Sequence, residues 1–261
     1  MPQISPHEKL TATIRNAARE HGVALIAYVV AGYPKKNDFI KTLREVAEAA
    51  DVVEVGVPFS DPMADGVTIQ RASHAAIQQG VSLKWILAEL KKAGEMPAPV
   101  VLMSYLNPLY AFGYEQLAAA AAESHVSGFI VPDLPLEESD DFRTRLDARG
   151  LALINLITPS TPEDRARRLS ATASGFIYAV TSKGTTGSAS ALPTDVTRYL
   201  DRIRASASLP VCAGFGVRTP EQVRGLSGHA DGVIVGSALV EEVEAGRQVG
   251  GYLGALRSRR H

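Results

Sequence analysis

One glutamate interrupts a run of valines, and its position in the chain suggests chemistry. Residues 52–57 read Val-Val-Glu-Val-Gly-Val, so strand alternation sends Val53, Val55 and Val57 to one face and Glu54 to the other. The all-valine face suits packing against helices, which leaves Glu54 pointing inward. Burial disfavours an ionised carboxylate and raises its pKa toward values useful in proton transfer. Glu54 is therefore predicted to be a catalytic acid–base, with a glutamate held by a structural partner as the alternative.

Two more carboxylates, Asp61 and Asp65, follow in residues 58–66, a segment longer than a minimal strand-to-helix turn. Active-site residues of barrel enzymes lie in this position, after the carboxyl end of a strand. Asp61 precedes Pro62 and is better explained by a turn. Asp65 precedes a helical run, so a catalytic role and a helix N-cap are equally compatible with its spacing.

Glycines and hydroxyl side chains gather late in the chain, after the sixth, seventh and eighth predicted strands. The three groups are residues 181–188, residues 214–216, and Gly236 with Ser237 at the start of an apolar helical run. Backbone N–H groups in such turns, together with the dipole of a short helix, bind a phosphate without arginine. The pattern therefore predicts an anion site built from backbone.

Other chemistries fit the sequence less well. Residues 214–216 (GFG) lack the third glycine of a dinucleotide fingerprint and occur late in the chain. Lys183 suggests a Schiff-base aldolase, but it lies beyond a strand end in a glycine-rich loop, where a solvated lysine is expected. His74, His125 and His229 show no paired metal spacing, so no metal is predicted.

Short β-rich runs alternate with longer helical patterns, as in parallel βα units. The predicted strands are residues 25–30, 52–57, 100–104, 128–131, 152–156, 175–180, 210–213 and 232–235. The predicted helices are residues 38–50, 67–79, 114–124, 136–149, 162–171, 194–205 and 220–227. Eight strands predict a (β/α)₈ barrel, the TIM barrel of the α/β class, as a single domain over residues 1–261. A doubly wound sheet is the alternative, but it usually has fewer strands and a phosphate loop after the first strand.

The composition predicts a soluble globular protein that binds a small molecule. The chain is 46% hydrophobic and 21% charged, and its formal net charge of -1 provides no broad footprint for nucleic acid or an anionic membrane. No stretch reaches the roughly 18 apolar residues of a membrane span. Cys212 is the only cysteine and is expected to be a buried thiol in a reducing, cytoplasmic compartment.

Residues 53–66 (VEVGVPFSDPMADG) closely resemble the second strand and following loop of the tryptophan synthase alpha subunit family. Further matching segments, in the family's order over nearly the whole chain, are residues 103–108 (MSYLNP), 131–135 (VPDLP), 184–187 (GTTG), 214–216 (GFG) and 231–237 (DGVIVGS). The resemblance implies a carbon–carbon lyase of tryptophan biosynthesis. Such an enzyme cleaves indole-3-glycerol phosphate to indole and glyceraldehyde 3-phosphate and needs no cofactor in this chain.

The resemblance also implies a role for each matching residue. Glu54 would be the general acid–base, Asp65 would hold the indole N–H, and Tyr178 would lie near Glu54. The residues implied to form the indole pocket are Tyr28, Tyr105, Phe215 and Ile234. Those implied to bind the phosphate are Gly187, Gly216, Gly236 and Ser237, while Thr186 matches a loop threonine that meets the aspartate on closure.

The resemblance further implies a partner. Members of the family pair with a beta subunit that carries pyridoxal phosphate and receives the indole, in an alpha2-beta2 heterotetramer. Pro58, Asp61 and Asn107 match positions near that interface.

Three places depart from the family pattern: Val30, Val67, and Ser182 with Lys183. The altered loop motivates an alternative function, a stand-alone lyase that releases free indole. A weakly catalytic subunit that mainly activates a beta partner is a further alternative, against which the intact Glu54 and Asp65 argue. A barrel isomerase acting on another sugar phosphate is disfavoured by the apolar aromatic wall.

Overall fold

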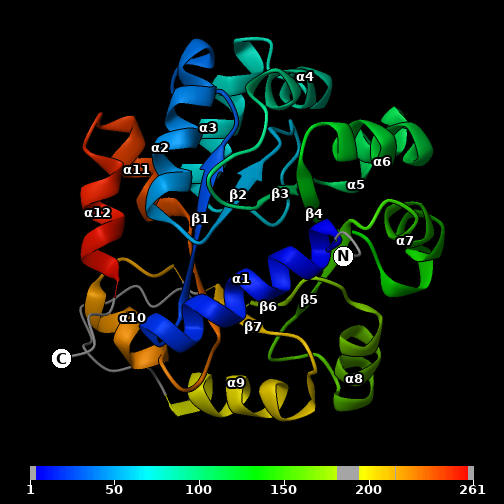
Figure 1. Ribbon diagram of the computed structural model, residues 1–261, viewed down its shortest axis with the longest axis vertical. Helices are drawn as coiled ribbons and strands as arrows, with labels where there is room; N and C mark the ends of the chain where they lie inside the picture. Colours follow the sequence, from blue (N-terminus) through cyan, green and yellow to red (C-terminus); the bar gives the residue numbers. More distant parts are fainter. Residues whose placement is uncertain (1–3, 181–193, 215, 258–261) are drawn as a thin grey trace.

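The computed structural model describes residues 4–180, 194–214 and 216–257 (Figure 1). Within these residues eight parallel strands form a closed barrel in which each strand pairs with the next and β8 pairs with β1. The strands are β1 (Ala24–Val30), β2 (Val52–Gly56), β3 (Val100–Met103), β4 (Val126–Ile130), β5 (Ala152–Ile157), β6 (Ile177–Val180), β7 (Val211–Gly214) and β8 (Gly232–Val235). The predicted (β/α)₈ barrel is confirmed.

The strands carry different side chains on their two faces, as the alternation in β2 predicted. Val53 and Val55 belong to the large core between strands and helices, whereas Val52 belongs to a smaller cluster inside the barrel. The strand residues of that interior cluster are Ala24, Ile26, Val52, Val101, Ile130, Ala152, Ile154, Cys212 and Ile234. Cys212 is fully buried among them, as its apolar neighbours predicted.

Helix α1 (Pro6–His21) closes the amino-terminal end of the barrel, a role that the sequence analysis did not assign (Figure 1). Ser5 and Glu8 form a capping box, in which each side chain accepts a hydrogen bond from the other residue's backbone N–H. The α1 residues that pack into the interior cluster are Leu10, Ile14 and Ala17. The carboxyl ends of the strands therefore form the mouth at the opposite end.

The remaining helices surround the barrel in Figure 1. They are α2 (Phe39–Ala49), α3 (Val67–Gln78), α4 (Leu83–Ala93), α5 (Leu106–Phe112), α6 (Tyr114–Glu123), α7 (Asp140–Asp147), α8 (Glu163–Thr172), α9 (Thr194–Ser206), α10 (Pro220–Leu226), α11 (Ser237–Glu244) and α12 (Val249–Leu256). Most predicted helices match these bounds closely. The helix predicted over residues 136–149 is instead a 3₁₀ turn, Leu136–Glu138, followed by α7. Ser139 Oγ donates a hydrogen bond of 2.7 Å to Leu136 O, which closes that turn before α7 begins.

The start of β6 differs from the prediction for a local reason. β6 begins at Ile177 rather than at Gly175, because Gly175 has φ +83°, a left-handed conformation that an extended strand does not contain. Helix α4, in the connection between β2 and β3, was not among the predicted helices. Its start is marked by Ser82, whose side chain accepts a hydrogen bond from Trp85 N.

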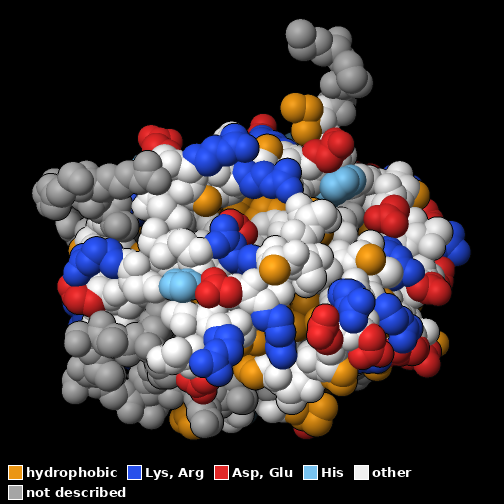
Figure 2. All heavy atoms as spheres, turned by 90° about the horizontal axis from the view of Figure 1, so that it is seen from below, with side chains coloured by type: hydrophobic (Ala, Val, Ile, Leu, Met, Phe, Trp, Pro, Cys, Tyr) orange, Lys and Arg blue, Asp and Glu red, His pale blue; other side chains and the backbone are white. Residues whose placement is uncertain are grey.

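The outer surface carries charges of both signs. On the face in Figure 2, Lys and Arg side chains alternate with Asp and Glu, which agrees with the formal net charge of -1. Within the residues that the structure describes, none of the helices combines the length and apolar character that crossing a bilayer would require.

Candidate active site

A cavity of about 320 Å³ opens at the carboxyl-terminal end of the barrel. This is the end at which barrel enzymes carry their catalytic groups. The cavity brings together eight of the residues singled out from the sequence, namely Tyr28, Glu54, Asp65, Tyr178, Gly216, Ile234, Gly236 and Ser237. Thr186, Gly187 and Phe215 lie outside the described residues. Residues that are far apart in the sequence therefore meet at one mouth.

Glu54 projects from β2 into this cavity and is fully buried. Neither of its carboxyl oxygens has a hydrogen-bond partner within the described part of the chain. Burial raises the pKa of Glu54 from 4.5 to about 8, and the nearby charge of Asp65 adds to the increase. A carboxyl with this pKa is mostly protonated at neutral pH and can both donate and take back a proton.

Asp65 lies at the edge of the cavity, at the end of the segment that follows β2. The N-cap of α3 is Gly66, and no side chain caps that helix, so the structure does not use Asp65 as a helix cap. Gln70 instead donates a side-chain hydrogen bond of 2.8 Å to Asp65 O and fixes the backbone there. Burial raises the pKa of Asp65, and a hydrogen bond from Tyr105 acts against that increase. The side chain therefore does not cap α3, and Asp65 lines the cavity, where it can face a ligand.

Tyr105 anchors the segment that carries Asp65. Its hydroxyl accepts a hydrogen bond of 2.8 Å from Ala64 N, and its ring stacks on Phe59 with centroids 5.0 Å apart. Tyr105 was expected to wall the indole pocket, but it does not line the cavity and lies behind Asp65. Asp61 is exposed and accepts a hydrogen bond from Ser60, as a turn residue would.

Two tyrosines form the walls beside Glu54, and each lies over a glycine of the next strand. A Cβ on Gly56 would be 2.1 Å from the Tyr28 hydroxyl, and a Cβ on Gly214 would be 2.7 Å from the Tyr178 ring. Burial is the largest cause that raises the pKa of each tyrosine well above its ordinary value. Both hydroxyls therefore keep their protons at neutral pH, and the two glycines leave the space that the rings fill.

The far side of the cavity is built from backbone. Gly236 is the N-cap of α11, and the first N–H groups of a helix have no partner inside it. Gly236 and Ser237 both line the cavity, together with Gly216, whose φ of +67° only glycine adopts readily. Backbone N–H groups and the dipole at a helix start are the features with which proteins bind anions, so the predicted anion site stays a prediction at this side of the cavity.

Sequence reasoning missed several apolar side chains of the wall. Met103 of β3, Leu156 of β5 and Ile69 of α3 line the cavity between its two polar ends. The alternation that identified Glu54 would have identified Leu156, because Ile154 two residues earlier lies in the barrel interior. The wall favours a flat apolar ligand between Glu54 and Asp65.

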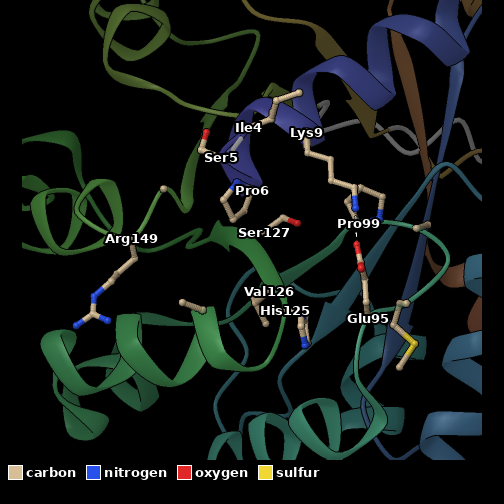
Figure 3. A pocket seen from close by; sticks show the side chains of 14 residues that line it. Ile4, Ser5, Pro6, Lys9, Glu95, Pro99, His125, Val126, Ser127 and Arg149 are labelled. Carbon is tan, nitrogen blue, oxygen red and sulfur yellow. Dashed lines mark hydrogen bonds and ion pairs between the residues drawn. The ribbon is translucent and has the colours of Figure 1, made fainter. Parts of the chain in front are cut away.

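A larger cavity, of about 650 Å³, lies at the opposite end of the barrel and is shown in Figure 3. Lys9 of α1 pairs with Glu95 at 2.5 Å, and both residues line this cavity together with His125 and Arg149. Residues at the amino-terminal end of a barrel serve stability rather than catalysis. The smaller cavity at the mouth is therefore the candidate active site.

Metal ligands are not gathered in the part of the chain that the structure describes. Within residues 4–180, 194–214 and 216–257, no group of three or more His, Cys, Asp or Glu side chains is placed to hold a metal ion. The histidines serve locally instead. His74 contacts Gln78 at 3.0 Å and His229 contacts Asp201 at 2.8 Å, both at the surface.

Comparison with known proteins agrees with the site. A family model of the tryptophan synthase alpha chain matches residues 14–252. The tryptophan synthase alpha chain of Nitratidesulfovibrio vulgaris is 44% identical over 253 residues, covering 96% of this chain and 98% of the relative. That of Carboxydothermus hydrogenoformans is 43% identical and covers 85% of this chain and 84% of the relative.

Solved structures that resemble this chain include members of the same family. Tryptophan synthase from Mycobacterium tuberculosis matches with a TM-score of 0.86 and 32% identity, covering 95% of this chain and 96% of that chain. Tryptophan synthase subunit alpha from Legionella pneumophila matches with a TM-score of 0.86 and 31% identity, covering 98% of both chains. Since sequence, fold and site agree, the chain belongs to the tryptophan synthase alpha chain family, the lyases that act on indole-3-glycerol phosphate.

Proposed function

We propose that this chain cleaves indole-3-glycerol phosphate with Glu54 as the acid–base, Asp65 as the partner of the indole nitrogen, and backbone amides as the phosphate site. The observation that carries the proposal is the buried Glu54, which has no hydrogen-bond partner among the described residues and a pKa raised to about 8. A protonated carboxyl facing an apolar cavity is suited to protonate a carbon atom.

Glu54 would act twice in the reaction. Its protonated form donates a proton to the indole carbon that bears the glycerol chain, which places a positive charge on the indole nitrogen. The resulting carboxylate then removes the proton of the adjacent glycerol hydroxyl. The carbon–carbon bond breaks, its electron pair returns to the indole ring, and the aldehyde of glyceraldehyde 3-phosphate forms. Glu54 ends the cycle protonated, so no further proton donor is needed.

Asp65 would stabilise the charge that develops between these two proton transfers. Its carboxylate, across the cavity mouth from Glu54, would accept a hydrogen bond from the indole N–H and offset the positive charge on the nitrogen. The hydrogen bond between Tyr105 and Ala64, at 2.8 Å, keeps the adjoining backbone in place for this contact. An anchored carboxylate of this kind requires little reorganisation during the reaction.

The remaining residues would bind and orient the substrate. Tyr28, Tyr178 and Ile234 present apolar surface to the indole ring, and Gly216, Gly236 and Ser237 face the phosphate. The sequence resemblance also assigns phosphate binding to Gly187, a role in loop closure to Thr186 and an indole contact to Phe215. Tyr105 would contribute through Asp65 rather than by contact with the ring.

Indole release from indole-3-glycerol phosphate tests the proposal. Glu54→Gln is expected to reduce turnover by about 10³-fold, because general acid–base catalysis contributes rate factors of this order. Binding of glyceraldehyde 3-phosphate should survive, because the phosphate site lies on other strands. Exposed Glu48→Gln on α2 serves as the matched control and should leave turnover unchanged. Near-normal turnover of Glu54→Gln would remove Glu54 from the mechanism.

A beta subunit is the proposed partner, in an alpha2-beta2 heterotetramer that receives the indole. Asp61 and Asn107, which match interface positions of the family, are both exposed, whereas Pro58 is buried. Two large apolar side chains beside them are exposed to solvent, Met63 to 86% and Tyr110 to 71%. Exposed apolar side chains of this size are typical of a surface that a partner covers. Pyridoxal phosphate would belong to that partner.

The same assay, run with and without a beta subunit, separates the remaining functions. Stimulation by the partner supports the heterotetramer, whereas high turnover by the chain alone favours the stand-alone lyase. Negligible turnover in both arms, with activation of the partner, favours the weakly catalytic subunit. We further propose that residues 1–261 act as one barrel domain in the cytoplasm, where the single thiol of Cys212 stays reduced.

A further inference from the structure

The carboxylate of Glu241 in α11 accepts hydrogen bonds from two other segments near the mouth of the barrel, the segment after β7 and helix α3. Arg218, in the segment after β7, donates two hydrogen bonds to it, of 2.7 Å to Oε2 and 3.1 Å to Oε1. Thr68 of α3 donates a third, of 3.3 Å, to Oε1. A single side chain therefore joins segments that are far apart in the sequence.

Each of these three segments carries a residue that lines the catalytic cavity. Thr68 follows Asp65 by three residues, and Arg218 follows Gly216 by two residues. Glu241 lies four residues after Ser237, which places both on one face of α11. The contacts of Glu241 thus connect the helix that follows Asp65 to both described parts of the phosphate side of the cavity.

The backbone of Arg218 is also held by hydrogen bonds. A contact of the Arg218 side chain therefore helps to fix the position of Gly216, two residues earlier in the same segment. Arg218 N donates a hydrogen bond of 2.7 Å to the side chain of Gln222, and Arg218 O accepts one of 3.2 Å from the Tyr252 hydroxyl. The paired hydrogen bonds from Arg218 are also the main cause that lowers the pKa of Glu241. Bidentate contacts between arginine and a carboxylate fix geometry better than single ion pairs do.

We propose that Glu241 is a positioning residue that sets the spacing between the phosphate site and Asp65. This inference rests on the proposed function, because it assumes that the two ends of one substrate occupy these two places. A substrate that spans both ends is sensitive to their separation, since misplacement of about 1 Å costs a rate factor of roughly 10². The affinity of a ligand that occupies only one of these places does not depend on their separation.

The chain contains a matched control one turn farther along the same two helices. Arg71 of α3 pairs with Glu244 of α11 at 2.5 Å, so this pair also joins α3 to α11. Among the described residues, neither side chain of this pair has a hydrogen bond to the segment after β7. Removing it tests the link between α3 and α11, including the adjoining Tyr33, without the connection to Gly216.

The experiment compares the whole substrate with its two halves. For Glu241→Ala and Arg218→Ala, we expect KM for indole-3-glycerol phosphate to rise about tenfold. The inhibition constants of indole and of glycerol 3-phosphate, each measured alone, should change by less than about twofold, because each end of the site stays intact. Glu244→Ala should change none of the three values, and circular dichroism establishes that each variant is folded.

Three results would overturn the inference while wild-type turnover remained normal. One is an unchanged KM in both Glu241→Ala and Arg218→Ala. Another is a parallel rise of KM and of either inhibition constant, which would place Glu241 within one subsite only. The third is the same rise in Glu244→Ala, which would assign the effect to helix packing. Loss of wild-type cleavage would instead refute the proposed function.

Discussion

Replacing Glu54 by glutamine should remove a pH dependence that this carboxyl imposes on folding. Its pKa is about 8 in the folded chain and 4.5 when it is solvated, so the folded state binds the extra proton between these values. Stability therefore falls as pH rises through this window, by about 1.4 kcal/mol for each pH unit. Between pH 5 and pH 9 the loss amounts to about 4 kcal/mol, which is absent in the variant.

Urea unfolding at a series of pH values measures this difference. Trp85, the only tryptophan, packs against Phe39 with ring centroids 5.4 Å apart and can report unfolding by fluorescence. The contributions of other titrating groups to the free energy of unfolding cancel when wild type is compared with Glu54→Gln at each pH. The variant should be close to wild type at pH 5 and about 4 kcal/mol more stable at pH 9. Glu48→Gln, at an exposed site on α2, should show no such divergence.

A constant difference between wild type and Glu54→Gln across this pH range would refute the reasoning. It would mean that Glu54 ionises near 4.5 in the folded chain, so a donor or water must reach its carboxyl oxygens. Glu54 would then be a carboxylate at neutral pH, and its proposed first step as an acid would lose its physical basis.

Two further outcomes follow from the same geometry. kcat/KM, which reports the free enzyme, should fall as pH rises through about 8, because Glu54 must be protonated to start the reaction; a profile that is flat from pH 6 to pH 9 would contradict this. Gly56→Ala should lower kcat/KM by about tenfold, since its Cβ would lie 2.1 Å from the Tyr28 hydroxyl and displace that wall. Gly250→Ala, where a Cβ meets nothing within 4 Å, is its control, and equal kinetics of the two variants would exclude the steric argument.

The inward position of Glu54 was predictable because it follows from the backbone alone. Strand alternation places Val53 and Val55 against helices whatever surrounds them, and Glu54 must then face the interior. The position of Gly236 at a helix start was predictable for a similar reason, since the glycine and the apolar helical run that follows it are adjacent in the sequence. Both positions could be predicted from the local backbone geometry and from the number of predicted strands.

Spacing alone did not decide whether Asp65 caps a helix, because a cap and a catalytic carboxylate have the same sequence pattern. In the structure the N-cap of α3 is Gly66, and no side chain caps that helix. Gln70 bonds to Asp65 O and Tyr105 bonds to Ala64 N, and neither contact has a local sequence signal. Tyr105 was assigned to the pocket wall from the family resemblance, and no local signal in the sequence shows that its ring stacks on Phe59.

The pKa of Glu54 is high chiefly because the carboxyl is buried without a hydrogen-bond donor among the described residues. Arg218 holds the carboxylate of Glu241 ionised through two hydrogen bonds, whereas Glu54 has no such donor within the described residues. Burial then makes the protonated form the stable one, and the charge of Asp65 strengthens the preference. Any change that admits water beside Tyr28 or Tyr178 should therefore lower the pKa of Glu54 and stabilise the fold at high pH. Catalytic competence and alkaline stability are thus expected to change in opposite directions, because both follow from the same buried proton.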